Sequence, residues 1–147
     1  MKCALTGHRA VGKDLTRAAL EKTLRELAEK GTDTFFCGMA VGFDMLCCEI
    51  LLSLREELPL RVVACVPCAN QSERFSSDQK RLYERLLAAC DEKIVLHERY
   101  TEGCMFERNR YMVDACDFLL AYLRTQKGGT FYTVNYAKKK GKSILFV

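Results

Sequence analysis

Short apolar runs alternate with longer amphipathic segments along the whole chain. The runs are rich in Val, Ile, Leu, Phe, Ala and Cys, and most are bounded by Gly, Pro or charged residues, which is typical of buried strands. They predict strands at residues 3–6, 34–37, 61–66, 93–96, 117–122 and 143–147.

The segments between these runs have helical periodicity. In the first, Leu20, Leu24 and Leu27 recur at the spacing of one helix face, and Gly31 follows where a glycine commonly ends a helix. The second is apolar nearly all round, so we expect it to be largely buried, and Pro59 closes it. The pattern predicts helices at residues 14–30, 43–58, 78–90, 105–115 and 128–140.

Strands that alternate with helices of this length favour a parallel sheet whose right-handed crossovers cover both faces. We therefore predict the α/β class: a Rossmann-like three-layer α/β/α sandwich with a mostly parallel sheet of about six strands. No linker, repeat or change of composition divides the chain, so we expect residues 1–147 to form a single domain.

The composition is that of a folded domain without a membrane span. Of the 147 residues, 49% are hydrophobic and 29% are charged, and no segment offers the ~20 apolar residues that a membrane-spanning helix needs. The N-terminal segment lacks the apolar run of a secretory signal, so we expect a cytoplasmic protein with no membrane partner. The net charge of +4 comes from the second half, where a lysine cluster at residues 138–142 either is a solvated face or attracts phosphate groups.

The nine cysteines do not have the pattern of a disulfide framework. Their number is odd, and Cys37 and Cys65 lie within apolar runs, which is typical of free buried thiols in a reducing compartment. Cys65 and Cys68 have the spacing of a metal or redox pair, but zinc needs two further ligands and the chain has only His8 and His97. We therefore predict no metal site and no cofactor.

The chemistry is expected beyond the carboxyl ends of the strands, where open α/β sheets bind ligands. Glycines follow several strands, at Gly7, in the turn of residues 38–42 and in the turn of residues 128–129. Glycine lets the backbone approach a ligand, and a helix N-terminus supplies unpaired N–H groups, so these turns indicate a phosphate-bearing ligand. Tight strand–helix turns without a ligand are the alternative. Asp44 either binds a ribose hydroxyl or is an acid at a helix N-terminus.

Several common motifs are incomplete or missing. Gly7, Gly12 and Lys13 have the spacing of a P-loop, but the next residue is Asp14 where Mg²⁺ requires Ser or Thr. Asp14 is expected to cap the following helix as an N-terminal acid. No G-x-G-x-x-G fingerprint follows the first strand and no G-x-S-x-G elbow occurs, which disfavours NAD-type oxidoreductases and hydrolases with a serine elbow.

Four motifs, at residues 6–9, 37–44, 108–114 and 128–130, together resemble the YpsA-like branch of the SLOG superfamily. That superfamily groups the DNA-processing protein DprA with the LOG-type phosphoribohydrolases. The resemblance covers essentially the whole chain and keeps the order of the motifs. It implies a Rossmann-like domain that binds a nucleotide or a nucleotide-derived ligand, with the glycine turns on its phosphates.

The resemblance also defines an enzymatic alternative. In LOG enzymes, which release a base from a nucleoside monophosphate, an Arg in a Met-x-x-Arg segment and a Glu after a Gly-x-Gly-Thr turn are the active pair. Here Met105 and Arg108 match the first motif, but Thr133 occupies the position of the Glu. Hydrolysis would therefore need another carboxylate, Glu73 or Asp44, to stabilise the ribosyl cation.

Three functional hypotheses follow. The first is the binding of an ADP-ribose-like ligand in a sensing or regulatory role, and the second is a nucleotide N-glycosidase with Arg108 and Glu73 as catalytic residues. The third is binding of single-stranded nucleic acid, as in DprA-like proteins, and a homodimer is a further candidate assembly. The expected ligand-binding residues are Thr6, Gly7, Arg9, Gly38, Gly42, Asp44, Pro67, Arg108, Gly128, Gly129, Thr130 and Thr133.

Overall fold

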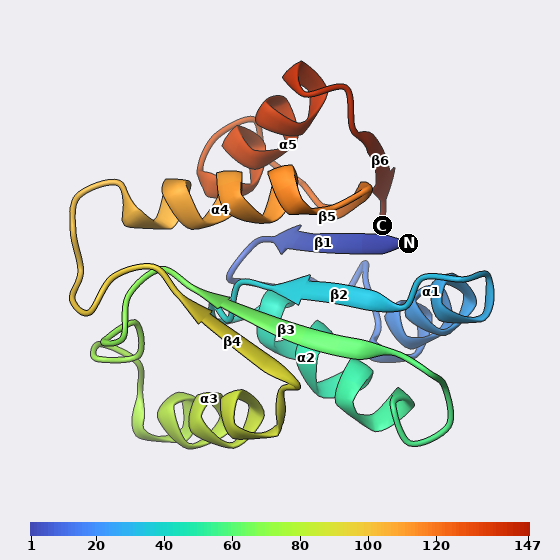
Figure 1. Cartoon of the computed structure of the whole chain (residues 1–147), viewed down its shortest axis with the longest axis horizontal. Helices are drawn as coiled ribbons and strands as arrows, with labels where there is room; N and C mark the ends of the chain where they lie inside the picture. The colour runs from blue at the N-terminus through green and yellow to red at the C-terminus, as the bar shows by residue number, and fades with distance from the viewer.

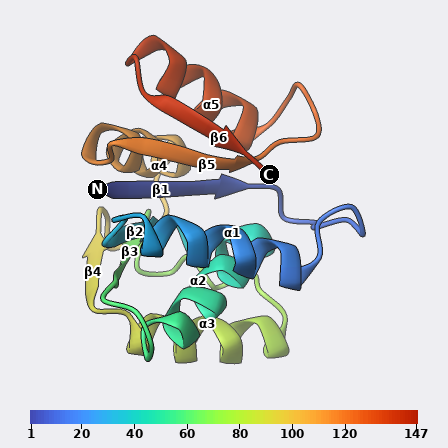
Figure 2. The ribbon, with the colours of Figure 1, turned by 90° about the vertical axis from the view of Figure 1, so that its right-hand side faces the viewer.

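The computed structural model describes residues 1–147 and has one six-stranded sheet with helices on both faces (Figure 1 and Figure 2). All strands are parallel, in the order β4-β3-β2-β1-β5-β6, which is the predicted Rossmann-like arrangement. The strands are β1 (Lys2–Gly7), β2 (Thr34–Cys37), β3 (Arg61–Val66), β4 (Glu92–Val95), β5 (Phe118–Tyr122) and β6 (Ser143–Phe146). The helices are α1 (Arg17–Glu29), α2 (Phe43–Leu54), α3 (Ser77–Ala89), α4 (Cys104–Ala115) and α5 (Gly129–Lys139).

Each predicted strand and helix is present, and only the ends differ. α1 begins at Arg17, later than predicted, because Thr16 caps it: the Thr16 Oγ1 accepts a hydrogen bond from the Ala19 N–H. The prediction that Asp14 caps this helix is therefore wrong. α2 ends at Leu54, before the predicted residue 58.

Two apolar cores, one on each face of the sheet, hold the layers together. The larger core packs α1, α2 and α3 against one face and contains the fully buried side chains of Leu24, Phe35 and Leu51. The smaller core packs α4 and α5 against the other face, around Met112 and Leu119. Because a core lies on each side, the central strands are apolar at successive positions rather than at alternate ones.

The end of β1 and the start of α2 are pressed together without room for additional side-chain atoms. A Cβ on Gly7 would overlap the Phe43 ring, and a Cβ on Gly42 would overlap the carbonyl group of Arg9. Gly42 also has a φ of +94°, a left-handed conformation that favours glycine. The turns that follow β1 and β2 therefore meet at the carboxyl edge of the sheet.

Three further features concern the whole chain. No helix has both the length and the apolar character that crossing a membrane requires. All nine cysteines are free thiols, and Cys90 alone among them is partly exposed. No group of three or more His, Cys, Asp or Glu side chains is arranged to hold a metal ion.

We expect Gly42→Ala to destabilise the protein much more than Gly31→Ala. Both glycines have positive φ, +94° and +110°, so alanine is strained at either position. Only at Gly42 would the new methyl group overlap the Arg9 backbone, whereas open space surrounds the same position at Gly31. The strain costs about 1–2 kcal/mol and the overlap about 1–3 kcal/mol more. Urea unfolding of both variants measures the difference, and equal losses would contradict this account.

Candidate functional site

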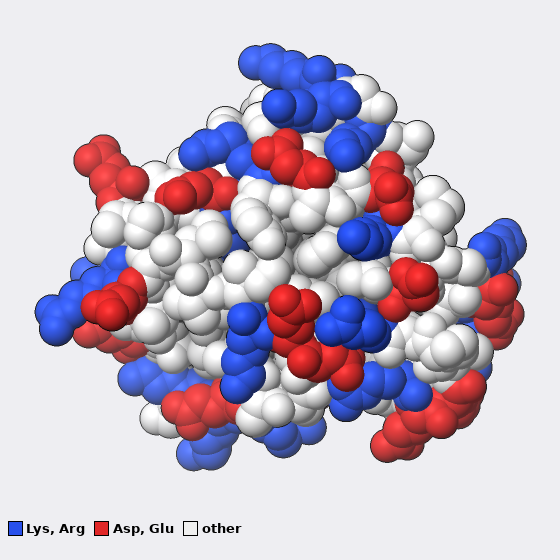
Figure 3. Space-filling model, viewed as in Figure 1, with Lys and Arg blue, Asp and Glu red and all other residues white.

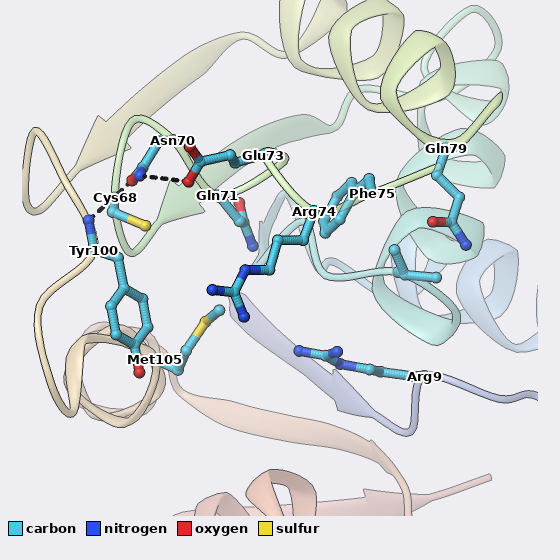
Figure 4. A pocket seen from close by; sticks show the side chains of 11 residues that line it. Arg9, Cys68, Asn70, Gln71, Glu73, Arg74, Phe75, Gln79, Tyr100 and Met105 are labelled. Atoms are coloured by element: carbon cyan, nitrogen blue, oxygen red, sulfur yellow. Dashed lines mark hydrogen bonds between the residues drawn. The ribbon is translucent and has the colours of Figure 1, made fainter. Parts of the chain in front are cut away.

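A pocket of about 670 Å³ opens at the carboxyl edge of the sheet, where ligands bind in folds of this kind (Figure 4). Its walls come from the loops that follow β1, β2, β3 and β4 and from the first turns of α3 and α4. The lining residues are Arg9, Val41, Cys68, Asn70, Gln71, Glu73, Arg74, Phe75, Gln79, Tyr100 and Met105.

Two guanidinium groups give the pocket its charge. Arg9 and Arg74 come from the loops after β1 and β3, and both side chains extend into the same space (Figure 4). Neither of them forms an ion pair within the chain. Glu73 is the one carboxylate in the lining, and it accepts a hydrogen bond from the Asn70 side chain at 3.2 Å. A concave surface with two unpaired cations attracts an anion.

Aromatic side chains border the same space. Tyr100 is 61% exposed, and its N–H donates to the Asn70 Oδ1 at 2.9 Å, which joins the β4–α4 loop to the β3–α3 loop. Phe75 packs edge-on against Tyr83 of α3, with ring centroids 5.5 Å apart. Rings held in this way offer an apolar surface to a planar group of a ligand.

Behind the lining, the Gly38 carbonyl is the point at which several segments meet. It accepts hydrogen bonds from the Gln71 Nε2 at 3.0 Å and from the Arg108 Nη1. The Gln71 Oε1 in turn accepts from the Tyr83 hydroxyl at 3.0 Å. The β3–α3 loop is thereby fixed to the end of β2 and to α3.

Arg108 lies below the pocket floor rather than in the pocket. It is 4% exposed, and its Nη1 also approaches the Cys65 carbonyl at 3.4 Å, while its Nε donates to the Asn109 Oδ1 at 2.8 Å. Burial lowers the pKa of this guanidinium, and the nearby Asp44 carboxyl opposes that shift. Its donors are directed at protein carbonyl groups, so in this conformation it braces the ends of β2 and β3.

Asp44 is a buried carboxyl next to Arg108. Its Oδ2 accepts a hydrogen bond from the Ala40 N–H at 3.3 Å, and its Oδ1 has no partner. Burial raises the pKa of this carboxyl to about 6, and the charge of Arg108 limits the rise. A Cβ on Gly38 would lie 2.9 Å from both the Asp44 Oδ2 and the Arg108 Nη1, so glycine is the residue that fits between them.

The structure separates the predicted site residues. Of the predicted ligand-binding residues Arg9 lines the pocket, as does Glu73, which was predicted as catalytic, whereas Gly38, Gly42, Asp44 and Arg108 support the pocket floor. The remaining predicted residues do not line it: Thr6 and Gly7 end β1, Pro67 is buried after β3, and Gly128, Gly129, Thr130 and Thr133 lie at the start of α5.

The start of α5 is a separate place at the same edge of the sheet. Gly128 and Gly129 are exposed, and Thr133 is buried with its hydroxyl donating to the Gly129 carbonyl at 2.8 Å. The side-chain nitrogen of Asn109, the hydrogen-bond partner of Arg108, lies 3.9 Å from the place that a Cβ on Gly129 would occupy. The two glycine turns are thus linked through α4 but do not share the pocket.

Sequence reasoning missed the residues of the β3–α3 and β4–α4 loops. Arg74, Phe75 and Tyr100 carry the charge and the aromatic surface, yet they lie outside the glycine turns that directed the search. The signal that would have found them is position: a polar loop follows β3, a central strand, at the carboxyl edge.

The P-loop-like segment is not arranged as a phosphate loop. The Gly12 N–H donates to the Tyr122 hydroxyl at 3.0 Å, and that hydroxyl donates to the Asp14 Oδ1 at 3.0 Å. Asp14 also pairs with Arg124, whose side chain lowers the pKa of the Asp14 carboxyl. Since α1 begins only at Arg17, Lys13 does not stand at a helix N-terminus.

Comparison with protein families gives a match over nearly the whole chain. The model of the YspA SLOG family matches residues 7–145. A UPF0398 protein of Bacillus licheniformis is 30% identical over 127 residues, which are 84% of this chain and 69% of that protein. The SPbeta prophage-derived protein YoqJ of Bacillus subtilis is 29% identical over 140 residues, 86% of this chain and 80% of that protein.

Two solved structures share the fold. DNA processing protein A of Helicobacter pylori, described with its single-stranded DNA binding mode, has a TM-score of 0.71 and 20% identity and matches 99% of this chain. DprA of Streptococcus pneumoniae has a TM-score of 0.74 and 18% identity over 99% of this chain. The chain spans 64% and 49% of those two structures, so roughly half to two thirds of each has a counterpart here.

The buried Asp44 carboxyl predicts a pH-dependent stability. Its pKa rises on folding from about 3.9 to about 6, so the folded protein binds more protons between these values. The protonated Asp44 carboxyl therefore contributes to the free energy of unfolding. This contribution is fully present below pH ~4 and is lost as the pH rises through 6. We expect Asp44→Asn, neutral at every pH, to gain about 2–3 kcal/mol relative to the native protein between pH ~4 and pH ~7.

Urea unfolding at both pH values measures this gain. Asp78→Asn is the matched control, because the Asp78 side chain is 88% exposed. A difference between Asp44→Asn and the native protein that does not change with pH would show that the Asp44 carboxyl is not perturbed.

Proposed function

The chain belongs to the YspA SLOG family, and on that premise we propose that it binds a nucleotide or a nucleotide-derived ligand of the ADP-ribose type. The proposed site is the pocket between Arg9 and Arg74. The observation that carries the proposal is the pair of guanidinium groups, which extend into one cavity from two different loops and form no ion pair within the chain. Guanidinium groups bind phosphate oxygens through paired, charge-assisted hydrogen bonds.

The dimensions and the walls of the pocket support this class of ligand. A cavity of about 670 Å³ lies within the range of 300–1,000 Å³ that is common for small-molecule sites. In the proposed arrangement Arg9 and Arg74 hold the phosphates, and the base lies against Tyr100 or Phe75. Arg108 and Asp44 act indirectly, because they fix the Gly38 turn on which the floor depends.

Binding in a sensing or regulatory role fits this geometry better than LOG-type hydrolysis. Thr133, at the position of the LOG glutamate, is buried in α5 and is bonded to the Gly129 carbonyl. A ribosyl cation formed in the pocket would have Glu73 as its carboxylate, and that side chain is exposed and already bonded to Asn70.

A second candidate, single-stranded nucleic acid, is supported by the likeness to the two DNA processing proteins. Its electrostatic support on this chain is the basic group over α5, to which Lys138, Lys139 and Lys140 belong (Figure 3). Elsewhere on the face in Figure 3, basic and acidic side chains alternate, so no extended basic track crosses it.

We expect ADP-ribose to raise the melting temperature of the native protein, and Arg74→Ala to weaken that effect. At 100 times Kd a ligand adds about 2.7 kcal/mol, which corresponds to roughly 5–10 °C for a domain of this size. Loss of one charge-assisted pair costs about 1.5–3 kcal/mol, a ten- to hundredfold loss of affinity. Thermal shift assays and calorimetry measure both quantities.

Arg81→Ala is the control for general charge effects, because Arg81 lies on the exposed side of α3 away from the pocket. Equal affinity of Arg74→Ala and Arg81→Ala for ADP-ribose would show that Arg74 does not bind the ligand. No shift with ADP-ribose, ADP or AMP at millimolar concentration would overturn the proposal. Chromatography of the same mixtures detects any free base, and its loss in Glu73→Gln would favour the N-glycosidase.

For the nucleic-acid candidate, we expect the affinity for a fluorescent oligothymidine to fall steeply with salt. Each phosphate contact contributes about −0.7 to the slope of log K against log salt concentration for single strands. Replacing Lys138, Lys139 and Lys140 by Gln should therefore reduce the slope by up to about 2. An affinity that does not depend on salt would exclude this candidate, and fluorescence anisotropy makes the measurement.

A further inference from the structure

The two edges of the sheet differ in their protection against association. An edge strand exposes unpaired N–H and C=O groups, and charged side chains on it hinder pairing with another chain. β4, at one edge, begins with Glu92 and Lys93, and Arg61 lies 3.6 Å from the Glu92 carboxylate. β6, at the other edge, has the sequence Ser-Ile-Leu-Phe and carries no charge.

Two cations beside β6 are engaged by carbonyl groups of the chain itself. The Lys142 Nζ donates to the Cys116 carbonyl at 2.7 Å, and the Arg124 Nη1 donates to the Val147 carbonyl at 2.9 Å. Two successive apolar residues of the strand remain in contact with water: Leu145 is 41% exposed and Phe146 is 51% exposed. An uncharged apolar edge is a site at which chains associate.

The backbone of β6 is also free to pair. The Val147 N–H donates to the Ala121 carbonyl of β5 at 3.0 Å, and parallel pairing uses the N–H and C=O groups of alternate residues. Ile144 and Phe146 therefore direct their N–H and C=O groups toward the open edge. A hollow of about 360 Å³, to whose lining Leu27 and Leu145 contribute, adjoins the strand on the α1 side.

We propose that β6 forms a homodimer interface by antiparallel pairing with β6 of a second copy across a two-fold axis. In the register centred on Leu145, Ile144 of each copy lies opposite Phe146 of the other. Each of these two pairs exchanges two main-chain hydrogen bonds. The two Leu145 side chains meet at the axis, where Cα atoms of such a pair are about 4.5 Å apart.

A second copy is the partner that the strand fits. A two-fold interface places the same residues on both sides, so the edge must match itself in shape and charge. β6 meets this requirement, because no side chain on it would bring like charges together. β4 does not meet it, because Glu92 and Lys93 would interfere with close pairing. The sheets of the two copies then form one continuous sheet.

Light scattering coupled to size-exclusion chromatography tests the interface. We expect twice the chain mass of 16.8 kDa for the native protein and the single-chain mass for Leu145→Lys, because two lysines would meet at the axis. Val95→Lys is the matched control at the β4 edge, since Val95 is 49% exposed, and it should remain a dimer. Phe146→Glu is a second interface variant for use if Leu145→Lys does not fold.

Amide hydrogen exchange distinguishes this interface from other dimers. The Ile144 and Phe146 amides should exchange at least tenfold more slowly in the native protein than in the monomeric variant. A native protein with the single-chain mass at all concentrations overturns the proposal. So does a dimer that persists in folded Leu145→Lys or Phe146→Glu, or a native dimer with unprotected Ile144 and Phe146 amides. A partner other than a second copy would leave the isolated native chain monomeric, which is the first of these outcomes.

Discussion

The candidate site depends on one buried contact, that between the Arg108 guanidinium and the Gly38 carbonyl. Arg108 reaches from α4 through the sheet edge and bridges the ends of β2 and β3, since it also approaches the Cys65 carbonyl. A buried guanidinium is stable only when its donors are satisfied. Here the Nη1 acceptors are the backbone carbonyl groups at the ends of β2 and β3, so the position of these strand ends and the position of the guanidinium depend on each other.

The contact constrains its neighbours in turn. Gly38 must lack a side chain because Arg108 and Asp44 occupy the space that a Cβ would need. Gln71 donates the second hydrogen bond to the Gly38 carbonyl, and this bond positions the β3–α3 loop that carries Arg74. The exposed cation of the pocket is thus positioned by the buried one. Burial leaves the Asp44 Oδ1 without a partner, and the same burial raises the pKa of the Asp44 carboxyl.

The fold could be predicted from the sequence because the spacing of apolar residues can be seen within each segment, and this spacing is what the two cores require. Residues 61–66 are apolar at nearly every position, which indicates a strand covered on both faces, and β3 is such a strand. The N-cap of α1 was not predicted correctly because Asp14 and Thr16 are both residue types that cap helices. Tertiary contacts decide between them, since Asp14 is held by Tyr122 and Arg124. The pocket was readable only in part.

Glycine marks a close backbone approach without saying what approaches, and at Gly38 the approaching group is a side chain of the protein itself. Tyr100 and Arg74 line the same pocket from two different loops, so no pattern within either loop indicates that they belong to one site.

The pocket and the proposed dimer interface lie at different places on the sheet, and this separation determines how ligand binding could affect dimer formation. The pocket is built on the loops after β1 to β4, whereas the uncharged edge is β6, beyond β5. Antiparallel pairing of two β6 strands directs the carboxyl edges of the two copies in opposite directions, so neither pocket faces the partner. Any influence of association on the ligand would therefore have to pass through β5 and β1. β1 adjoins the pocket through Arg9, whose carbonyl is packed against Gly42, and this contact is the route that such coupling would take.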